Sequence, residues 1–323
     1  MKIARDADID PAPLAGKRVA IMGYGNQGRA QALNLVDGGV DVVIGLRPGS
    51  QSAQRVAADG LAWAPIEEAA ASDIVMMLAP DETLPALYQA IEHFLPAEGA
   101  LGFSHGLAIR FGFIAPRADL AVFMVAPKGP GSALRSLYIE GRGMPALYAV
   151  AQDPWGNAEA LALAYGRAIG CGRAGLIAST FAEECEADLF NEAAVVWGAV
   201  PEILIAGFET LVEAGVSEQV AYMECIGELK LLAELIESRG IAGMREAISN
   251  TAELGAVSGG KRIVDQRVRD EMRAILDGVR NGKFAAELMA EQEAGYPRLQ
   301  AARALAHGQA VERVRNQLSD LKR

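Results

Sequence analysis

Residues 18–39 read RVAIMGYGNQGRAQALNLVDGG, and this stretch decides the fold of the N-terminal half. An apolar, β-branched run leads into G-x-G-x-x-G, and the segment that follows has the spacing of an amphipathic helix. Glycines at such a strand-to-helix turn let the backbone approach a pyrophosphate at the helix N-terminus. The sequence therefore predicts a dinucleotide site, with the following candidate residues: Gly23, Tyr24, Gly25, Asn26, Gln27 and Gly28.

The same pattern continues along the chain. Between residues 17 and 175, short apolar runs alternate with helical segments, which predicts βαβ units and a parallel sheet covered on both faces. Beyond residue 180 the helical period dominates and strand signals are almost absent. We therefore expect an α/β Rossmann-type domain over residues 1–180 and an all-α domain over residues 181–323, in keeping with a chain of 323 residues.

The turn after the predicted second strand bears on the choice of cofactor. An NAD site usually places an acidic residue there to bind the ribose 2′-hydroxyl. Here the turn carries Arg47, Ser50 and Ser52 and no acid. A guanidinium and two hydroxyls suit a 2′-phosphate, so the sequence favours NADPH over NADH. The alternative is that these side chains only solvate a turn.

The negative charge of the chain is concentrated in one segment. The formal net charge is −11, and residues 181–237 hold thirteen acids but only one base. Within this segment Asp188 and Glu192 are four residues apart, as are Glu224 and Glu228, so on a helix each pair shares a face. Paired carboxylates without a nearby histidine suit Mg²⁺, although an ordinary solvated face explains the spacing equally well.

Composition excludes several classes of protein. The acidic balance argues against a nucleic-acid partner, because such recognition depends on Lys and Arg. Three cysteines without C-x-x-C spacing indicate reduced thiols rather than disulfides or zinc. No long uninterrupted apolar run and no signal-like N-terminus are present, so we expect a cytoplasmic protein without a membrane partner.

Eight motifs in one order resemble ketol-acid reductoisomerase of the short, class I form. They are GYGNQG (23–28), GLRPGS (45–50), SHG (104–106), APKGPG (126–131), DLFNE (188–192), GFETLVEAG (207–215), ECIGELK (224–230) and ISNTAE (248–253).

The resemblance implies an NADPH-binding Rossmann domain followed by a knotted helical domain, with two Mg²⁺ ions per site. Asp188 would bridge the metals, Glu192 would complete one shell and also act in catalysis, and Glu224 and Glu228 would come from a partner subunit. Further roles follow from the matched motifs: His105 and Lys128 as catalytic polar groups, Asp81, Glu82 and Gly131 on the cofactor side, and Ser249, also from the partner, on the substrate carboxylate.

The implied reaction has two steps. A Mg²⁺-assisted alkyl shift converts 2-acetolactate or 2-aceto-2-hydroxybutyrate to a 3-hydroxy-2-ketoacid, and NADPH then reduces the ketone to the 2,3-dihydroxy acid of branched-chain amino-acid biosynthesis. The resemblance also implies that the enzyme is at least a homodimer, with a dodecamer also open.

Some positions depart from the family pattern: Leu84, Leu107, Ala108, Ser132–Leu134, Ala193, Trp197 and Gly227. Such changes could alter the substrate or only affect packing. Two alternatives therefore stay open: a related enzyme that reduces another 2-ketoacid or an imine, and a non-catalytic NADP-binding protein.

Overall fold

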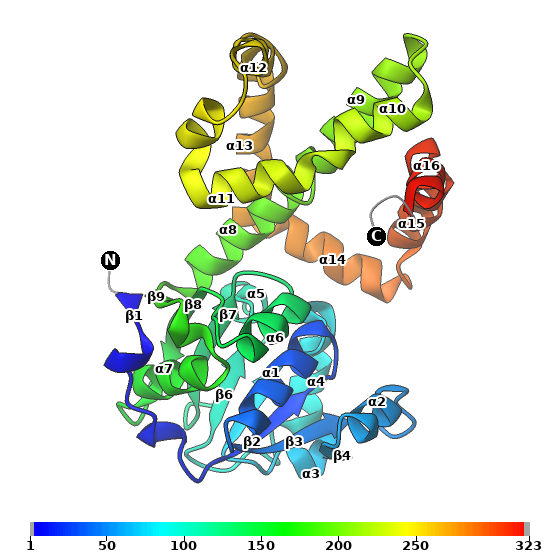
Figure 1. Ribbon diagram of the computed structural model, residues 1–323. Helices are drawn as coiled ribbons and strands as arrows, with labels where there is room; N and C mark the ends of the chain where they lie inside the picture. The colour runs from blue at the N-terminus through cyan, green and yellow to red at the C-terminus, as the bar shows by residue number, and fades with distance from the viewer. Residues whose placement is uncertain (1–2, 320–323) are drawn as a thin grey trace. The chain divides into compact units, whose positions relative to one another are not determined.

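The computed structural model describes residues 3–319, which divide into two compact units at the boundary between Ala187 and Asp188. The first unit is α/β and the second is all helical (Figure 1). The helix that spans their boundary, α8 (Phe181–Ala194), begins at the residue where the sequence pattern changes to helical periodicity. The two units are described separately below.

The N-terminal unit is built on a nine-stranded sheet in the order β1-β9-β8-β7-β6-β5-β2-β3-β4. From β4 to β7 this is the order of a dinucleotide-binding fold, and the direction of winding reverses between β2 and β5. The strands are β1 (Ile3–Ala4), β2 (Arg18–Met22), β3 (Asp41–Leu46), β4 (Ala62–Pro65), β5 (Ile74–Met77), β6 (Ala100–Phe103), β7 (Ala121–Pro127), β8 (Ala146–Gln152) and β9 (Leu176–Ala178).

The sheet is mixed, so the expectation of a purely parallel sheet was wrong at one edge. β7 pairs antiparallel with β8, with Pro127 opposite Ala146, and β1 pairs antiparallel with β9. The cause is the connection after β7: helix α6 (Gly131–Ile139) is followed by residues 140–145, which lead back to the edge where β7 ended. There Lys128 N donates to Pro145 O at 2.9 Å.

Helices cover both faces of this sheet (Figure 1). Alternate residues of each strand point to opposite faces; in β2, Val19 and Ile21 join one buried cluster while Ala20 and Met22 join the other. The helices of the unit, besides α6 and the first part of α8, are α1 (Asn26–Asp37), α2 (Ser52–Ala58), α3 (Ile66–Ala69), α4 (Leu84–Ile91), α5 (Leu107–Arg110) and α7 (Ala158–Ala168). The short 3₁₀ turns are η1 (Asp6–Asp8), η2 (Ala12–Leu14), η3 (Asp81–Thr83) and η4 (Cys171–Arg173).

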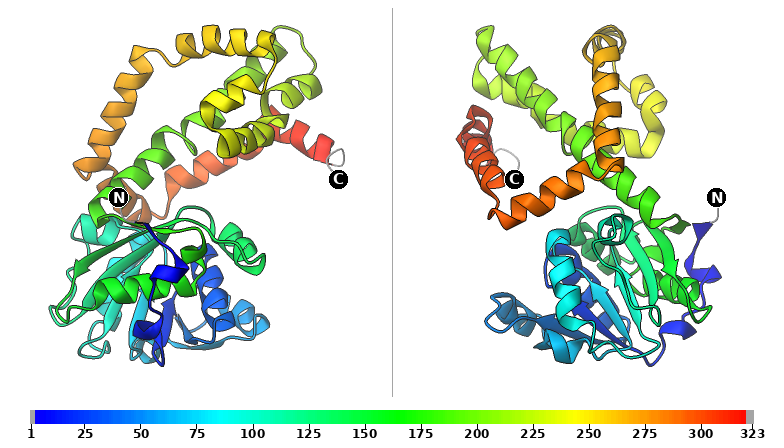
Figure 2. Two further views of the ribbon diagram at one scale, coloured as in Figure 1. Left: turned by 60° about the vertical axis from the view of Figure 1, so that its left-hand side comes forward. Right: turned by 180° about the vertical axis from the view of Figure 1, so that it is seen from behind.

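The second unit consists of helices that spread apart in space (Figure 2). Its buried cluster has only five residues: Phe208, Ala221, Tyr222, Val311 and Val314. The helices are α9 (Ala199–Glu213), α10 (Glu218–Tyr222), the π-helical turn η5 (Met223–Gly227), α11 (Leu229–Glu246), α12 (Asn250–Ile263), α13 (Gln266–Arg280), α14 (Lys283–Glu293), α15 (Pro297–Gly308) and α16 (Ala310–Leu318).

Candidate functional site

The glycine-rich turn follows β2 and leads into α1, as the motif predicts. Gly23 has a φ of 101°, which favours glycine, and a Cβ atom there would lie 3.0 Å from the backbone of Ala79. A Cβ atom at Gly28 would lie 2.3 Å from Gly23 O, whereas Gly25, the N-cap of α1, faces open space. The turn is therefore tightly packed on the protein side and open where a phosphate would approach the helix N-terminus.

The start of α6 fixes this turn from a second side. A Cβ atom at Gly131 would lie 2.1 Å from Asn26 O, so only glycine fits there. Gln27 Nε2 donates to Gly129 O at 2.9 Å, and Ser132 N donates to Asn26 Oδ1 at 3.0 Å. The segment that carries Lys128 is thus held against the dinucleotide-binding turn. The structure places Gly131 against Asn26; its expected position near the nicotinamide stays a prediction.

A cavity of about 270 Å³ lies beside the glycine-rich turn, and the three residues predicted to bind a 2′-phosphate belong to its lining. Arg47, Ser50 and Ser52 all line it, together with Gly23 and Tyr24. Tyr24 is itself buried, and its hydroxyl donates to Asp59 Oδ2 at 2.7 Å. Burial raises the pKa of the Tyr24 phenol, and the neighbouring Asp59 raises it further, so the phenol stays neutral.

Sequence reasoning missed Arg55 and Arg29, which line a second cavity of about 310 Å³ together with Gly25 and Asn26 of the glycine-rich turn. Arg55 Nη2 donates to Ser52 Oγ at 3.1 Å and to Tyr24 O at 3.2 Å, which ties α2 to the glycine-rich turn. Arg29 contacts Asp59 through two nitrogens at 2.7 Å each. The available signal was position: Arg55 lies three residues after Ser52 on the same helix, so the two side chains share a face.

Two ion pairs bring charged groups together at the carboxyl ends of β6 and β7. His105 Nδ1 lies 2.7 Å from Asp81 Oδ2, and Lys128 Nζ donates to Glu184 Oε1 at 2.7 Å. The second oxygen of Glu184 accepts a hydrogen bond of 2.8 Å from Gly106 N, next to His105. One carboxylate therefore connects the segments that carry the two candidate catalytic residues.

Glu184 is the residue of this group that sequence reasoning missed. Its side chain is only 1% exposed, and a carboxylate is seldom buried unless it is paired. It lies one helical turn before Asp188 on α8, so the spacing that singled out Asp188 and Glu192 extends back to Glu184. Glu82, also expected on the cofactor side, lies with Asp81 in the turn η3.

The pKa of His105 results from opposing effects. Burial lowers it, but the hydrogen bonds to Asp81 and Cys185 and the charges of Asp81 and Glu184 together raise it well above its ordinary value. The surroundings of His105 therefore favour the protonated, positively charged imidazole. For Cys185, burial raises the pKa, which keeps this thiol neutral.

The carboxylates expected to bind metal occur as two separate pairs. Asp188 and Glu192 lie one turn apart on α8, as expected. Glu224 and Glu228 do not lie on a regular α-helix, so that expectation was wrong: Glu224 lies in the π-helical turn η5, and Glu228 is the residue between η5 and α11. The wider turn inserts a residue and redirects the side chains, and Gly227 within it has a low preference for α-helix. Over residues 3–319, no three His, Cys, Asp or Glu side chains gather into a metal-binding group.

Ser249 is the N-cap of α12. Its Oγ accepts a hydrogen bond of 3.2 Å from Ala252 N, and the residue is exposed. Its hydroxyl is thereby fixed in direction.

Six of the departures from the family pattern fall into two groups. Leu84, Leu107, Ala108 and Leu134 are all buried at 2% exposure or less, so these changes affect packing of the Rossmann unit. Ala193 and Trp197 instead line a cavity of about 590 Å³ in the helical unit, and Trp197 is 64% exposed. Only the second group can change the shape of a binding surface directly.

A Rossmann-type nucleotide-binding unit followed by an all-helical unit that carries paired carboxylates defines a nicotinamide-dependent oxidoreductase of two domains. Residues 13–175 match the family model for the NADPH-binding domain of acetohydroxy acid isomeroreductase, and residues 181–323 match that for the C-terminal domain of ketol-acid reductoisomerase. The chain belongs to the ketol-acid reductoisomerase family. It is therefore an enzyme of the oxidoreductase/isomerase type.

Solved structures agree with this assignment. An NADH-preferring ketol-acid reductoisomerase from an uncultured archaeon is 43% identical, with a TM-score of 0.96 and coverage of 99% of both chains. A semialdehyde dehydrogenase NAD-binding protein from Cupriavidus necator is 18% identical, with a TM-score of 0.63 and coverage of 82% of this chain and 99% of the other. At that identity the second likeness shows the fold alone.

Proposed function

We propose that the protein is an NADPH- and Mg²⁺-dependent ketol-acid reductoisomerase. Its substrates would be 2-acetolactate and 2-aceto-2-hydroxybutyrate, and its products the corresponding 2,3-dihydroxy acids of branched-chain amino-acid biosynthesis. The observation that carries the proposal is the buried Glu184, which joins Lys128 to the segment of His105 beside a dinucleotide-binding turn. A binding protein without turnover has no need for such a buried charged network, since burying charges is costly.

The residues of the charged network would control protons during the reaction. A protonated His105, held through Nδ1 by Asp81, can act as an acid toward a developing alkoxide. Lys128 Nζ, held by Glu184 Oε1, can donate a hydrogen bond to a substrate oxygen and pass a proton at that atom. Glu184 would act as a positioning group because both of its oxygens already accept hydrogen bonds.

The choice of NADPH rests on the 270 Å³ cavity. Arg47, Ser50 and Ser52 line it without an acidic residue, and Arg55 holds the Ser52 hydroxyl. This donor set suits a 2′-phosphate, whereas an NADH site would gain from an acid at the same turn. The archaeal relative is described as NADH-preferring, so the preference has to be measured directly.

The four paired carboxylates are suited to Mg²⁺, because they supply only oxygen donors. When bound, the metal would act as a Lewis acid that polarises substrate oxygens. Asp188 and Glu192 would hold it from one chain, and Glu224, Glu228 and Ser249 would come from a partner subunit. The occurrence of the carboxylates as pairs, without a group of three within residues 3–319, supports a site that two chains complete.

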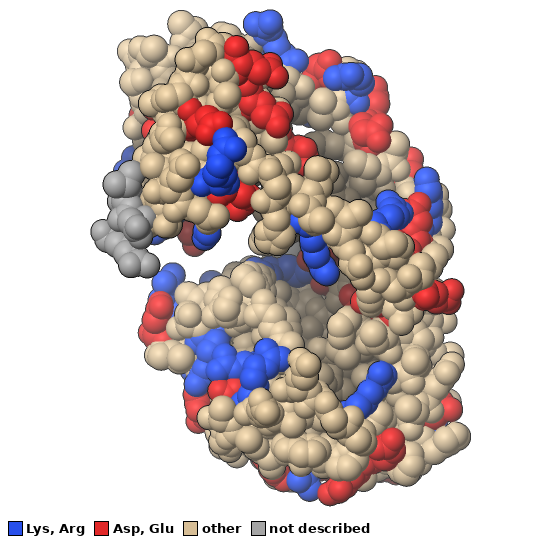
Figure 3. Space-filling model, turned by 90° about the vertical axis from the view of Figure 1, so that its right-hand side faces the viewer, with Lys and Arg blue, Asp and Glu red and all other residues tan. Residues whose placement is uncertain are grey.

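The surface of the helical unit supports a homodimer as the minimum assembly. Large apolar side chains are exposed along its helices, and wide uncharged areas lie between its charged side chains in Figure 3. Residues 181–213 are the one helical stretch of the described chain long and apolar enough to cross a membrane, yet only 6% of its most apolar window is buried. Several acidic side chains on α8 would be unfavourable in lipid, so we propose that a second copy of the chain, and not a membrane, buries these apolar helices. A cytoplasmic location is part of the same proposal.

A changed substrate is the second candidate, and Trp197 favours it. This side chain lines the 590 Å³ cavity together with Ala193, at positions where the family pattern differs. A bulky indole at a binding surface would select a 2-ketoacid or imine of different shape.

One assay separates these candidates. The protein is incubated with NADPH, Mg²⁺ and either 2-acetolactate or 3-hydroxy-3-methyl-2-oxobutyrate. Oxidation of NADPH with both compounds supports the reductoisomerase; oxidation with only the second indicates a plain reductase, and with neither a changed substrate or a protein without turnover. Asp188→Asn should lower turnover of acetolactate by about a thousandfold, the scale on which electrostatic stabilisation of a transition state contributes. Glu209→Gln, an exposed acid on α9, is the matched control and should keep normal turnover.

A further inference from the structure

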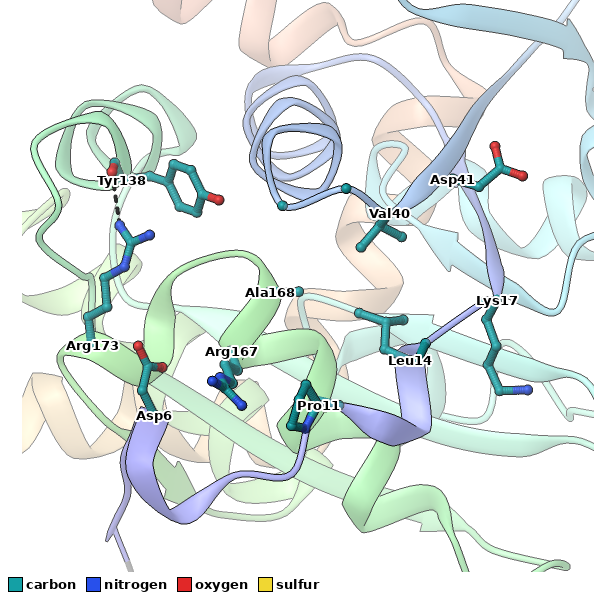
Figure 4. A pocket seen from close by; sticks show the side chains of 15 residues that line it. Asp6, Pro11, Leu14, Lys17, Val40, Asp41, Tyr138, Arg167, Ala168 and Arg173 are labelled. Carbon is teal, nitrogen blue, oxygen red and sulfur yellow. Dashed lines mark hydrogen bonds between the residues drawn. The ribbon is translucent and has the colours of Figure 1, made fainter.

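The largest unexplained feature of the N-terminal unit is a cavity of about 530 Å³ at the amino ends of β2 and β3 (Figure 4). Its walls come from residues 11–17, from the turn between α1 and β3, and from the last turns of α6 and α7. The glycine-rich turn lies at the other end of β2, about 16 Å away for a strand of five residues. This cavity is therefore distinct from the dinucleotide site.

One wall of the cavity carries a carboxylate whose oxygens make no hydrogen bond within the described residues. Asp6 Oδ1 is buried against Gly172, where a Cβ atom would lie 2.1 Å away, and it has no hydrogen-bond partner among residues 3–319. Within the same described residues Asp6 Oδ2 has no partner either, and this second oxygen is not among the buried ones. A half-buried carboxylate without a donor is unfavourable. The site thus offers a negative charge to a cationic group.

Two guanidinium groups lie beside this carboxylate. Figure 4 shows Asp6, Arg167 and Arg173 at the same side of the cavity. Arg167 Nη1 donates to Ile9 O at 2.8 Å, and Arg173 Nη1 donates to Tyr138 O at 2.9 Å. These bonds fix both groups through one nitrogen and leave further N–H donors, since a guanidinium has five. The site therefore also offers positive charge to an anionic group.

Three helices end at this cavity, and their C-termini favour a zwitterionic ligand over an anion. Gly38 caps α1, Tyr138 lies in the last turn of α6, and Ala168 ends α7. Helix C-termini are negative poles that favour a cation. A phosphate or another multiply charged anion is disfavoured there. Leu14, Val40 and Ala168 form an apolar region next to the charged wall, as Figure 4 shows.

We propose that this cavity binds a free α-amino acid with an apolar side chain. The carboxylate would bind Arg167, the ammonium group would bind Asp6 Oδ2, and the side chain would lie along Leu14, Val40 and Ala168. The cavity has the size of known small-molecule sites, which span about 300–1,000 Å³. This binding does not depend on the reductoisomerase reaction.

The test is calorimetric titration of the full-length protein with L-leucine, in the absence and presence of saturating NADPH. We expect saturable binding of one leucine per chain in both conditions. 4-Methylpentanoate lacks the ammonium group and 3-methylbutylamine lacks the carboxylate; each should bind at least about tenfold more weakly, the effect of losing one charge-assisted hydrogen bond. No saturation up to about 10 mM, the millimolar limit of weak ligand sites, or equal binding of the analogues, or displacement by NADPH, would overturn the proposal.

Two variants test the residues. Asp6→Asn and Arg167→Gln should each weaken leucine binding by about tenfold or more. Asp8→Asn, on the same 3₁₀ turn, and Arg18→Gln make the same changes in charge outside the cavity lining and should bind leucine normally. Unchanged NADPH affinity checks that each variant is folded. Normal leucine binding by a folded Asp6→Asn variant would contradict the site, even if Arg167→Gln fails to fold because it loses the bond to Ile9.

Discussion

The two units of this protein differ in how they bury apolar surface. The N-terminal unit has two extensive clusters, one on each face of its sheet, whereas the helical unit has one cluster of five residues. Large apolar side chains stand exposed in the helical unit, among them Leu231, Leu254 and Leu305 at 59%, 70% and 72%. A chain cannot offset its conformational entropy with so little burial. The N-terminal unit can thus be stable by itself, while the helical unit needs a second surface.

The largest effect is expected from breaking that second surface. Leu231→Glu places a charge on the exposed apolar side of α11 and should prevent formation of the proposed dimer, leaving a monomer without reductoisomerase activity. Sedimentation velocity and NADPH oxidation measure the two outcomes. Ile139→Glu makes the same change at a 67% exposed position of the N-terminal unit and should alter neither. If the Leu231→Glu variant stayed dimeric and active, the helical unit would not need this apolar surface of a second chain, and the contrast between the two units would be wrong.

A large-to-small substitution in the core of the N-terminal unit tests whether that unit is stable by itself. Phe123 is fully buried in β7 and its ring lies 5.9 Å from that of Tyr165. Phe123→Ala should lower the free energy of unfolding of the N-terminal unit by about 3–5 kcal/mol through lost burial and a residual cavity. The free energy of unfolding is measured by urea denaturation, with NADPH binding as the probe of the folded N-terminal unit. Dilution would dissociate the proposed dimer. If dilution weakened NADPH binding as strongly as Phe123→Ala does, the N-terminal unit would depend on the dimer and would not be stable alone.

The next prediction concerns the cofactor pocket within the stable unit. Changing both Ser50→Asp and Ser52→Asp puts two carboxylates where a 2′-phosphate would lie. The ratio of kcat/KM for NADPH to that for NADH should fall by at least about tenfold to a hundredfold, since the loss of even one charge-assisted hydrogen bond costs about 1.5–3 kcal/mol. Ser136→Asp, on the exposed side of α6, is the control. An unchanged ratio would contradict the NADPH assignment.

The smallest expected effect is on proton binding. Because the folded state raises the pKa of His105, the pairing with Asp81 stabilises the fold fully below about pH 6.5 and loses its contribution as the pH rises through the folded value. Asp81→Asn should lower the His105 pKa, as observed by NMR of the imidazole, and reduce the loss of stability between pH 6 and 9. His93, an 83% exposed histidine, provides a second imidazole signal for comparison. An unchanged His105 pKa in the variant would show that Asp81 does not control it.

Periodicity predicted the Rossmann unit well, because its strands are buried on both faces and are strongly apolar. It missed β1, β4 and β9, which are short and partly exposed, and the antiparallel pairing of β7 with β8. Strand direction depends on where a connection returns, and residues 140–145 carry no sequence signal for that. Helical periodicity also predicted the all-helical unit, whereas its π-helical turn at Glu224 depends on backbone hydrogen bonds that no residue pattern specifies.

The sequence also identified the glycine-rich turn and pointed to Arg47, Ser50 and Ser52, which line one cavity beside it; their contact with a ribose phosphate stays a prediction. It did not single out Glu184, because a carboxylate among thirteen acids has no distinguishing mark until its burial is known. Arg55 escaped for a similar reason: its role depends on a bond to a backbone carbonyl of Tyr24. Partners that lie far apart in the chain are fixed by the tertiary fold and not by local spacing.

The contact of Gly131 with Asn26 divides the dinucleotide site into a part that tolerates change and a part that does not. Any side chain at Gly131 would displace Asn26, whereas Arg47, Ser50 and Ser52 lie on a turn that is exposed or half-exposed. Cofactor preference can therefore diverge between close relatives through the turn alone. Members of one family can therefore keep the same pyrophosphate-binding turn while changing their preference between NADH and NADPH to match the cofactor that is abundant in their cells.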